Sequence, residues 1–156
     1  MPEPPLVSRA RELGFEHHAL GPLLHVLAAQ RGRARVAAIG GGAGAAWIVS
    51  ALPPEVPFVD VEGDGAFARA LAELFAEDEH VTVLHGDWHE LLPPHAPFDL
   101  LFCGGACDDD IVGLLLPGGT AVVATVDREF WLQHPEVSTL ELRVTPKAAA
   151  LVVVRG

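Results

Sequence analysis

A glycine-rich segment, Gly40-Gly41-Gly42-Ala43-Gly44, follows the apolar run 36–39 and precedes a stretch, 45–52, that can form a helix. Glycines let a backbone turn sharply and approach a ligand, and a helix N-terminus favours anionic groups. The next apolar run ends in Glu62, 18 positions after Gly44. A carboxylate at that place can accept hydrogen bonds from both hydroxyls of a ribose. Together these features predict a site for a nucleoside-containing ligand.

The glycine spacing and a second acid separate two kinds of cofactor. Loops that bind NAD have the spacing G-x-G-x-x-G, whereas here the third glycine, Gly44, comes one position early. This spacing favours S-adenosylmethionine over NAD. Gly86-Asp87-Trp88 follows the third apolar run, at the edge where ligands bind in open α/β sheets. The Asp87 carboxylate can accept a hydrogen bond from the exocyclic amine of adenine, with Trp88 packing nearby.

The elements that must position these residues follow from the hydrophobic pattern. Short apolar runs predict strands at 36–39, 58–61, 81–84, 98–103 and 120–125. Helices are expected at 20–27, at 45–52, after Asp64 and at 108–116. Two further strands, 137–144 and 148–154, are separated by a connection that permits only an antiparallel hairpin. We therefore predict a three-layer, Rossmann-like α/β domain with a mostly parallel sheet and a C-terminal antiparallel hairpin.

Length and charge limit the class of protein. The chain has 156 residues, which predicts one domain over 1–156, with a partly ordered N-terminal segment over 1–16. It carries 21 acidic and 10 basic side chains, a net charge of −11, which disfavours nucleic acid and anionic membrane surfaces as partners. No apolar run is long enough to span a bilayer, and the first residues lack the positive charge of a signal peptide. We expect a cytoplasmic protein with reduced thiols at Cys103 and Cys107.

The order of the motifs resembles the class I S-adenosylmethionine-dependent methyltransferases, in the branch of predicted O-methyltransferases related to catechol O-methyltransferase. The matching segments are 36–44, 59–64, 84–88, 97–102 and 116–119. The resemblance implies a seven-stranded sheet, with Glu62 holding the ribose, Asp87 the adenine, and the 40–44 loop passing under the methionine part. The predicted cofactor site also includes Gly63, Asp64, Gly86, Trp88 and Cys103.

The resemblance also implies a lost metal site. In the family, an Asp after the fourth strand and an Asp-Asn pair after the fifth hold magnesium, which requires oxygen ligands. Gly104 stands at the first position, and Ala124 and Thr125 stand at the pair. Cys107 replaces the family's lysine base, and the acids 108–110 lie several residues too far along. We therefore predict that no metal takes part.

The function expected from this sequence is metal-independent methyl transfer from S-adenosylmethionine to an oxygen atom of a small-molecule acceptor. Its alternatives are a non-catalytic protein that binds S-adenosylmethionine or S-adenosylhomocysteine, and an NAD(P)-binding module. No catalytic residue is assigned; His17, His18 and Asp127 are candidates for a base near the pocket rim. Trp131 is either core or a substrate wall. An edge strand in the hairpin and a thin N-terminal cap suggest a homodimer, which the negative charge opposes.

Overall fold

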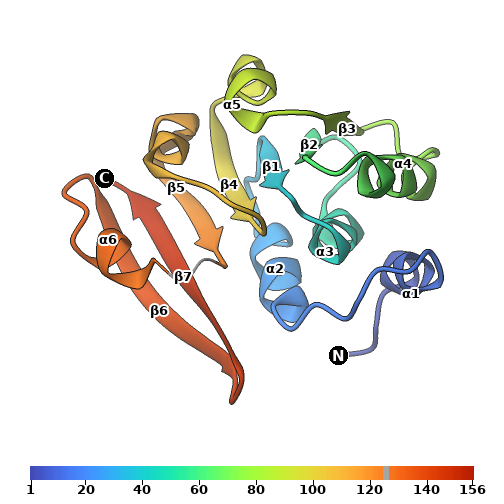
Figure 1. Ribbon diagram of the computed structural model, residues 1–156, viewed down its shortest axis with the longest axis horizontal. Helices are drawn as coiled ribbons and strands as arrows, with labels where there is room; N and C mark the ends of the chain where they lie inside the picture. The colour runs from blue at the N-terminus through green and yellow to red at the C-terminus, as the bar shows by residue number, and fades with distance from the viewer. Residues whose placement is uncertain (125–126) are drawn as a thin grey trace.

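The computed structural model describes residues 1–124 and 127–156 and contains one seven-stranded sheet, in the order β3-β2-β1-β4-β5-β7-β6 (Figure 1). The first five strands run parallel, and β7 pairs antiparallel with both β5 and β6. The predicted fold class is confirmed. The strands are β1 (Val36–Ile39), β2 (Phe58–Glu62), β3 (Val81–His85), β4 (Phe98–Cys103), β5 (Leu115–Val123), β6 (Val137–Thr145) and β7 (Ala148–Arg155).

Helices cover both faces of the sheet and supply its crossover connections. Among the described residues, no helix is long and apolar enough to cross a membrane. The helices are α1 (Pro5–Glu12), α2 (Gly21–Ala28), α3 (Ala43–Ala51), α4 (Gly65–Leu74), α5 (Trp88–Leu91) and α6 (Arg128–Leu132), with two 3₁₀ helices, η1 (Pro93–His95) and η2 (Asp109–Leu114).

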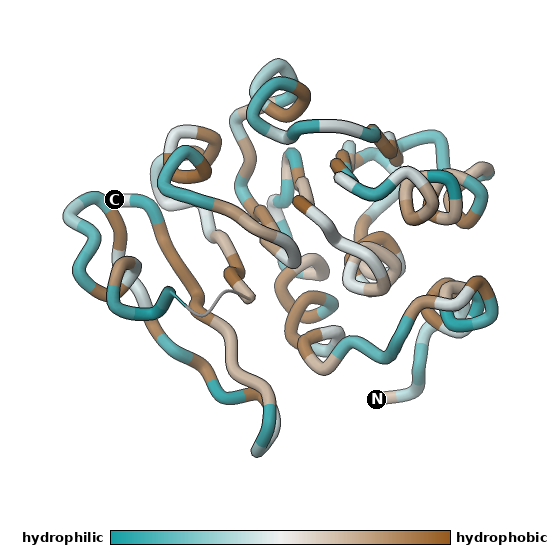
Figure 2. The backbone as a smooth tube through the Cα atoms, viewed as in Figure 1, coloured by the Kyte–Doolittle hydropathy of each residue, from teal (hydrophilic) through white to brown (hydrophobic). Residues whose placement is uncertain are grey.

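The central strands contain many apolar residues (Figure 2), and these pack on both faces of the sheet, as expected for strands covered on both sides. On one face, Phe58, Leu100 and Phe102 pack against α2 and α3. On the other face, Val59 and Leu101 pack against the elements that follow β3 and β4. The alternation of side chains along β2 therefore decides which of its residues approach α3 and which approach α5.

The N-terminal segment contains a helix that the hydrophobic pattern does not indicate. Residues 5–12 form helix α1, inside the segment 1–16. Val7 and Ala10 are buried, and α1 packs against α3. The helix has only two turns, so its short apolar stripe gives a weak periodic signal, and its stability comes from tertiary packing.

The segment after β4 also differs from its prediction. Instead of an α-helix over 108–116, the structure has the 3₁₀ helix η2, and β5 begins at Leu115, inside the predicted helix. Ile111 and Leu114 are buried at 3₁₀ spacing, which an apolar pattern does not distinguish from a short α-helix. The predicted end of this strand, Thr125, lies outside the described residues.

The face of α4 that packs on the sheet does not include its aromatic residue. Asp64 caps this helix as expected, since its Oδ1 accepts from the amides of Ala66 and Phe67. Phe67, however, is 52% exposed and rests against the Phe15 ring instead of facing the sheet. The buried face of the helix is carried by Ala68, Leu71 and Leu74.

Gly44 lets α3 pack closely on the sheet, which generates a prediction about stability. A Cβ at this position would lie 2.6 Å from the Phe102 ring and 3.1 Å from Leu24. Gly44→Ala is expected to destabilise the protein by about 1–3 kcal/mol, because overpacking outweighs the roughly 1 kcal/mol that alanine gains in a helix. Chemical denaturation of purified variants measures this difference.

The matched control is Gly113→Ala, because a Cβ at Gly113 would have open space around it. That variant is expected to unfold within about 0.5 kcal/mol of the parent, as surface substitutions usually do. Equal stabilities for the two variants would contradict the packing argument.

Candidate functional site

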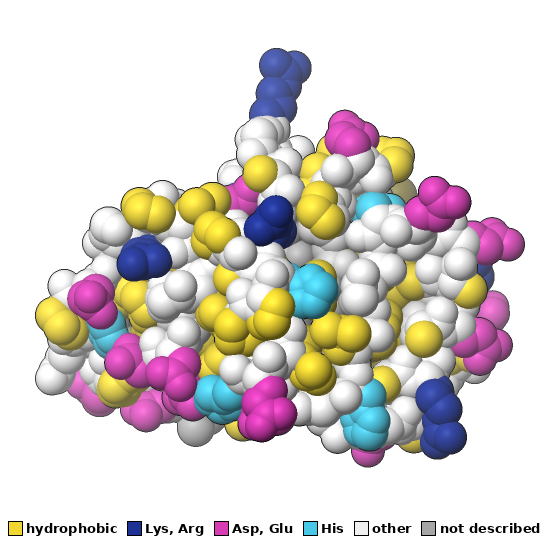
Figure 3. All heavy atoms as spheres, turned by 90° about the horizontal axis from the view of Figure 1, so that it is seen from above, with side chains coloured by type: hydrophobic (Ala, Val, Ile, Leu, Met, Phe, Trp, Pro, Cys, Tyr) yellow, Lys and Arg dark blue, Asp and Glu magenta, His cyan; other side chains and the backbone are white. Residues whose placement is uncertain are grey.

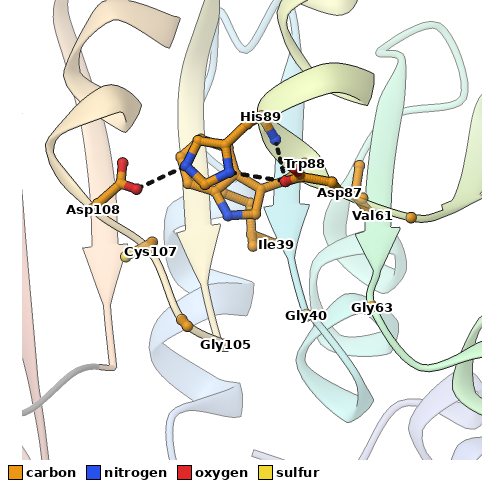
Figure 4. A pocket seen from close by; sticks show the side chains of 12 residues that line it. Ile39, Gly40, Val61, Gly63, Asp87, Trp88, His89, Gly105, Cys107 and Asp108 are labelled. Carbon is orange, nitrogen blue, oxygen red and sulfur yellow. Dashed lines mark hydrogen bonds and ion pairs between the residues drawn. The ribbon is translucent and has the colours of Figure 1, made fainter.

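A cavity of about 470 Å³ lies at the carboxyl ends of β1 to β4. This is the switch point of the sheet, because β1 has β2 on one side and β4 on the other. Open α/β sheets bind ligands at this place. Figure 4 shows the residues that line the cavity: Ile39, Gly40, Val61, Gly63, Gly86, Asp87, Trp88, His89, Gly105, Ala106, Cys107 and Asp108.

Five of the predicted cofactor residues line this cavity: Gly40, Gly63, Gly86, Asp87 and Trp88. They come from the ends of three neighbouring strands, which the parallel register brings to one edge. The structure therefore brings together the glycine loop, the turn after Glu62 and the turn after β3, as the motif order predicts.

The other predicted residues lie behind the lining. Gly44 is buried in α3, Asp64 caps α4, and Cys103 is completely buried at the end of β4. Gly41 and Gly42 face β2, where two acids accept hydrogen bonds from their amides. These residues shape the site from outside the cavity.

Glu62 holds the glycine loop directly. Its Oε1 accepts a hydrogen bond of 3.0 Å from the Gly42 amide, and the residue is only 3% exposed. Asp60, two residues earlier on β2, accepts a hydrogen bond of 3.0 Å from the Gly41 amide. The acid predicted to hold a ribose is thus fixed against the loop, and one carboxyl more than expected takes part.

Asp87 caps α5 as well as lining the cavity. Its Oδ1 accepts a hydrogen bond of 3.0 Å from the His89 amide and lies 2.8 Å from His89 Nδ1. The hydrogen bond with the His89 ring is the first cause that lowers the pKa of Asp87. The residue therefore offers a carboxylate at the cavity rim, the form that accepts from an adenine amine.

His89 links the two sides of the cavity. Its ring stacks on Trp88 with the centroids 3.7 Å apart, and its Nε2 lies 2.7 Å from Asp108 Oδ2 (Figure 4). Asp108 first and Asp87 second raise the pKa of His89 through hydrogen bonds. The bridge therefore joins the start of α5 to the loop after β4 most strongly when His89 is protonated.

Several residues that line the cavity are not predicted from the sequence. Val61 precedes the motif acid, and Gly105, Ala106 and Asp108 lie in the loop after β4. The pairing of Ile39 with Cys103 in register brings that loop beside the glycine loop. Knowledge of the strand order, in which β4 lies beside β1, would have been enough to predict that the loop after β4 lines the cavity.

The loop after β4 approaches the glycine loop so closely that position 104 must be glycine. A Cβ added to Gly104 would lie 2.5 Å from the Gly40 carbonyl oxygen, a backbone atom. An aspartate at this position, as the resembling family has, does not fit this backbone. Ala124 is exposed at the end of β5, and Thr125 lies outside the described residues.

Within residues 1–124 and 127–156, one group of side chains has the spacing of metal ligands: His89, Asp108 and Asp110, all exposed. Both ring nitrogens of His89 already lie within hydrogen-bond distance of carboxylates. The hydrogen-bonded bridge accounts for this group without an ion.

Two thiols meet at the end of β4. Cys103 is completely buried, whereas Cys107 is half-buried and lines the cavity. A hydrogen bond between them lowers the pKa of Cys107, and the same contact together with burial raises the pKa of Cys103. Cys107 is the more acidic thiol of the pair.

The candidates for a base are separated in space. His18 packs against Phe102 with the ring centroids 5.3 Å apart, and burial lowers its pKa. Neither His17 nor His18 is among the residues that line the cavity. Asp127 lines a smaller cavity of about 240 Å³ together with Phe130 and Trp131.

Trp131, for which the sequence leaves core and substrate wall open, belongs to the core. It is 1% exposed, and one edge of it reaches the smaller cavity. Cys107 and Asp108 line both cavities, so the loop after β4 borders the two of them.

The structure resembles those of known methyltransferases. TomG from Streptomyces achromogenes, an O-methyltransferase of tomaymycin synthesis crystallised with SAM, shares 25% identity and a TM-score of 0.79, over 99% of this chain and 92% of that chain. The O-methyltransferase from Bacillus cereus in complex with SAH shares 16% identity and a TM-score of 0.80, over 100% and 93%. The SAH-bound methyltransferase PaMTH1 from Podospora anserina shares 16% identity and a TM-score of 0.75, over 99% and 88%.

No family model and no curated protein matches the sequence. The fold of this chain is that of the class I methyltransferases of the O-methyltransferase branch, and the resemblance seen in the sequence motifs is confirmed.

The His89 bridge generates a prediction about titration. Asp108→Asn removes the first cause of the raised value, so the pKa of His89 is expected to fall toward its ordinary 6.5. Titration of the imidazole signals by nuclear magnetic resonance measures this change. Asp78→Asn, before β3 and away from the cavity, is the control and should leave the pKa of His89 where it is. An unchanged titration in Asp108→Asn would contradict the bridge.

Proposed function

We propose that this chain binds S-adenosylmethionine and transfers its methyl group to an oxygen atom of a small-molecule acceptor. The observation that carries the proposal is the cavity at the switch point, which the glycine loop, the turn after Glu62 and Asp87-Trp88 share. The fold and the proteins it resembles support the same function.

The residues present fit such a cofactor. Ile39, Val61 and Trp88 give the cavity apolar walls that suit an adenine ring. Asp87 places a carboxylate at the rim, where an exocyclic amine would need an acceptor. Glu62 does not line the cavity itself. Its buried carboxylate lies beside Gly63, which does, and its contact with the Gly42 amide would fix its position toward a ribose.

Methyl transfer from S-adenosylmethionine would need little acid–base catalysis from the side chains of this protein. When bound, S-adenosylmethionine supplies a methyl group on a positively charged sulfur, and transfer needs mainly alignment with the acceptor. The cavity residues would hold the donor, and the loop after β4 would divide it from the acceptor side. Cys107 lies on that divide.

The proposal includes independence from metal ions. Gly104 presents no side chain, and its amide donates to the Ile39 carbonyl at 2.9 Å. Ala124 has no oxygen in its side chain. The positions that hold magnesium in the resembling family therefore offer no carboxylate at residues 104 and 124.

A second candidate function follows from the same substitutions. A chain that keeps the cofactor residues but has lost the metal ligands and the lysine base also suits a protein that binds S-adenosylmethionine or S-adenosylhomocysteine without catalysis. The two candidates share the cavity and differ only in turnover.

The remaining proposals concern partners and place. Exposed Leu140 and Leu142 on the edge strand β6 support a homodimer. The net charge of −11 supports the absence of a nucleic-acid partner and is compatible with the cytoplasm. Figure 3 shows acidic side chains mainly near the margins of one face, with histidines both near the margins and among the apolar side chains.

Calorimetric titration with S-adenosylmethionine, S-adenosylhomocysteine and NAD tests the cofactor. The first two should bind and NAD should not. Glu62→Ala is expected to weaken binding by about 1–3 kcal/mol, because it leaves ribose hydroxyls without their acceptor and releases the Gly42 amide. Asp87→Ala should weaken binding in the same direction.

Glu77→Gln, an exposed residue after α4, is the matched control and should bind like the parent. Circular dichroism verifies that each variant is folded. Folded Glu62→Ala and Asp87→Ala proteins with parental affinity would place the cofactor elsewhere.

Metal independence is tested on turnover. With a panel of phenolic acceptors, methyl transfer is expected to persist in EDTA and to be unchanged by added magnesium, because residues 104 and 124 carry no ligands. Product is detected by mass spectrometry. Activity that EDTA abolishes and magnesium restores would contradict the prediction, and binding without any product would favour the non-catalytic candidate.

A further inference from the structure

Two acidic residues on one strand point into the protein side by side. Asp60 and Glu62 lie on the same face of β2, and they are 0% and 3% exposed. Acidic side chains are almost never fully buried unless they are paired with other groups. The intervening Val61 faces the opposite side, toward the cavity. The pair therefore needs a physical explanation.

Both acids hold the glycine loop. Asp60 Oδ1 accepts from the Gly41 amide and Glu62 Oε1 accepts from the Gly42 amide, each at 3.0 Å. Two consecutive backbone amides of the loop therefore donate hydrogen bonds to two side chains on the same face of β2. The motif explains Glu62, but it does not explain Asp60.

The second oxygen of Asp60 shows where a proton must be. Asp60 Oδ2 is buried and receives no hydrogen bond from a donor in the described part of the chain. A protonated carboxyl becomes a donor through this oxygen. Glu62 is the candidate acceptor, because its carboxyl holds the adjacent loop amide from the same buried face of β2. Burial first, and this neighbouring carboxyl second, raise the pKa of Asp60 well above its ordinary value.

In the described part of the chain, Glu62 is the charged side chain that acts on Asp60. Its neighbours in register on β1 and β3 are the apolar Ala38 and Val83, and α3 carries no charged residue. The charged side chains of α4, Arg69 and Glu73, are exposed, as is His85 on β3. Glu62 is the charged partner that faces Asp60 from the elements packed around it.

We propose that Asp60 is a positioning residue that acts in its protonated form: its Oδ2–H holds the Glu62 carboxylate and its Oδ1 holds Gly41, so that loss of this one proton weakens cofactor binding. The inference rests on the proposed function, because it concerns how Glu62 is presented to the ribose. It adds a residue that the motif does not contain.

The physical reason is the cost of a second buried charge. With one proton shared, the pair carries a single negative charge, and both loop amides keep their acceptors. Without the proton, two carboxylates repel each other in a site with little water, and one of them must move. Movement of either one displaces the loop or turns Glu62 from the ribose.

Asp60→Asn tests the proton directly. An asparagine carbonyl accepts from Gly41 and its amide donates to Glu62 at every pH, so it copies the protonated acid permanently. Binding of S-adenosylhomocysteine is measured by calorimetry from mildly acidic to alkaline pH. The parent is expected to lose affinity as pH rises, whereas Asp60→Asn should bind within about threefold of the parent at the acidic end of this range and lose less.

The amino group of S-adenosylhomocysteine also titrates in alkaline solution, but it does so equally with the parent and with Asp60→Asn. The difference between the two pH profiles therefore does not contain its contribution. Asp60→Leu keeps the branched shape of the side chain, although its methyl groups are larger, and removes both hydrogen bonds. It is expected to bind about tenfold more weakly at the acidic end of the pH range. Glu77→Gln is the control for a changed surface charge. A parental pH profile in Asp60→Asn, or parental affinity in Asp60→Leu, would overturn the inference.

Stability separates this inference from the proposed function. Because the folded state holds the Asp60 proton above the ordinary pKa of 3.8, the parent loses stability relative to Asp60→Asn as pH rises above that value. Denaturation at several pH values measures this without any ligand. A parent that binds no cofactor yet shows this slope refutes only the function; a parent that binds cofactor and shows no slope refutes the shared proton.

Discussion

The hydrogen bonds from two loop amides to two buried acids of β2 are the constraint on which the rest of the site depends. They fix the path of the glycine loop, with Gly41 held by Asp60 and Gly42 held by Glu62. That path sets the start of α3 and leaves the Gly40 carbonyl against the loop after β4. The loop after β4 is therefore in contact with the glycine loop. The pairing of β1 with β4 keeps the two loops in this position, and together they define the shape of the cavity.

The parallel core could be predicted from the sequence because each of its strands is an apolar run with a turn signal at its end. β1 and β4 have the expected bounds, and the hairpin follows from a connection too short for a crossover. Helix α1 and the 3₁₀ helix η2 could not be predicted in the same way. Val7, Ala10 and Ile111 are apolar at spacings that fit several local structures, and tertiary packing chooses among them.

At the candidate site, the sequence predicts which turns meet but not what each acid does there. Asp64, Asp87 and Asp108 each follow a strand of the parallel sheet, and all three side chains accept from amides at the start of a helix. A carboxylate at the carboxyl end of a strand suits a helix cap and a ligand equally, because both offer N–H donors. Asp60 was missed for the opposite reason: within a strand, an inward acid has no motif, and only its buried contacts reveal it.

The same crowding relates the glycine at position 104 to the shape of the candidate cavity. A Cβ of residue 104 would lie 2.5 Å from the Gly40 carbonyl oxygen, so an aspartate at that position would force the two loops apart. Such a side chain would therefore change the cavity that Gly40 and Gly105 line together. A closely packed pair of loops and a carboxylate at position 104 exclude each other in this backbone. The glycine at position 104 is thus a requirement of the site as it is built.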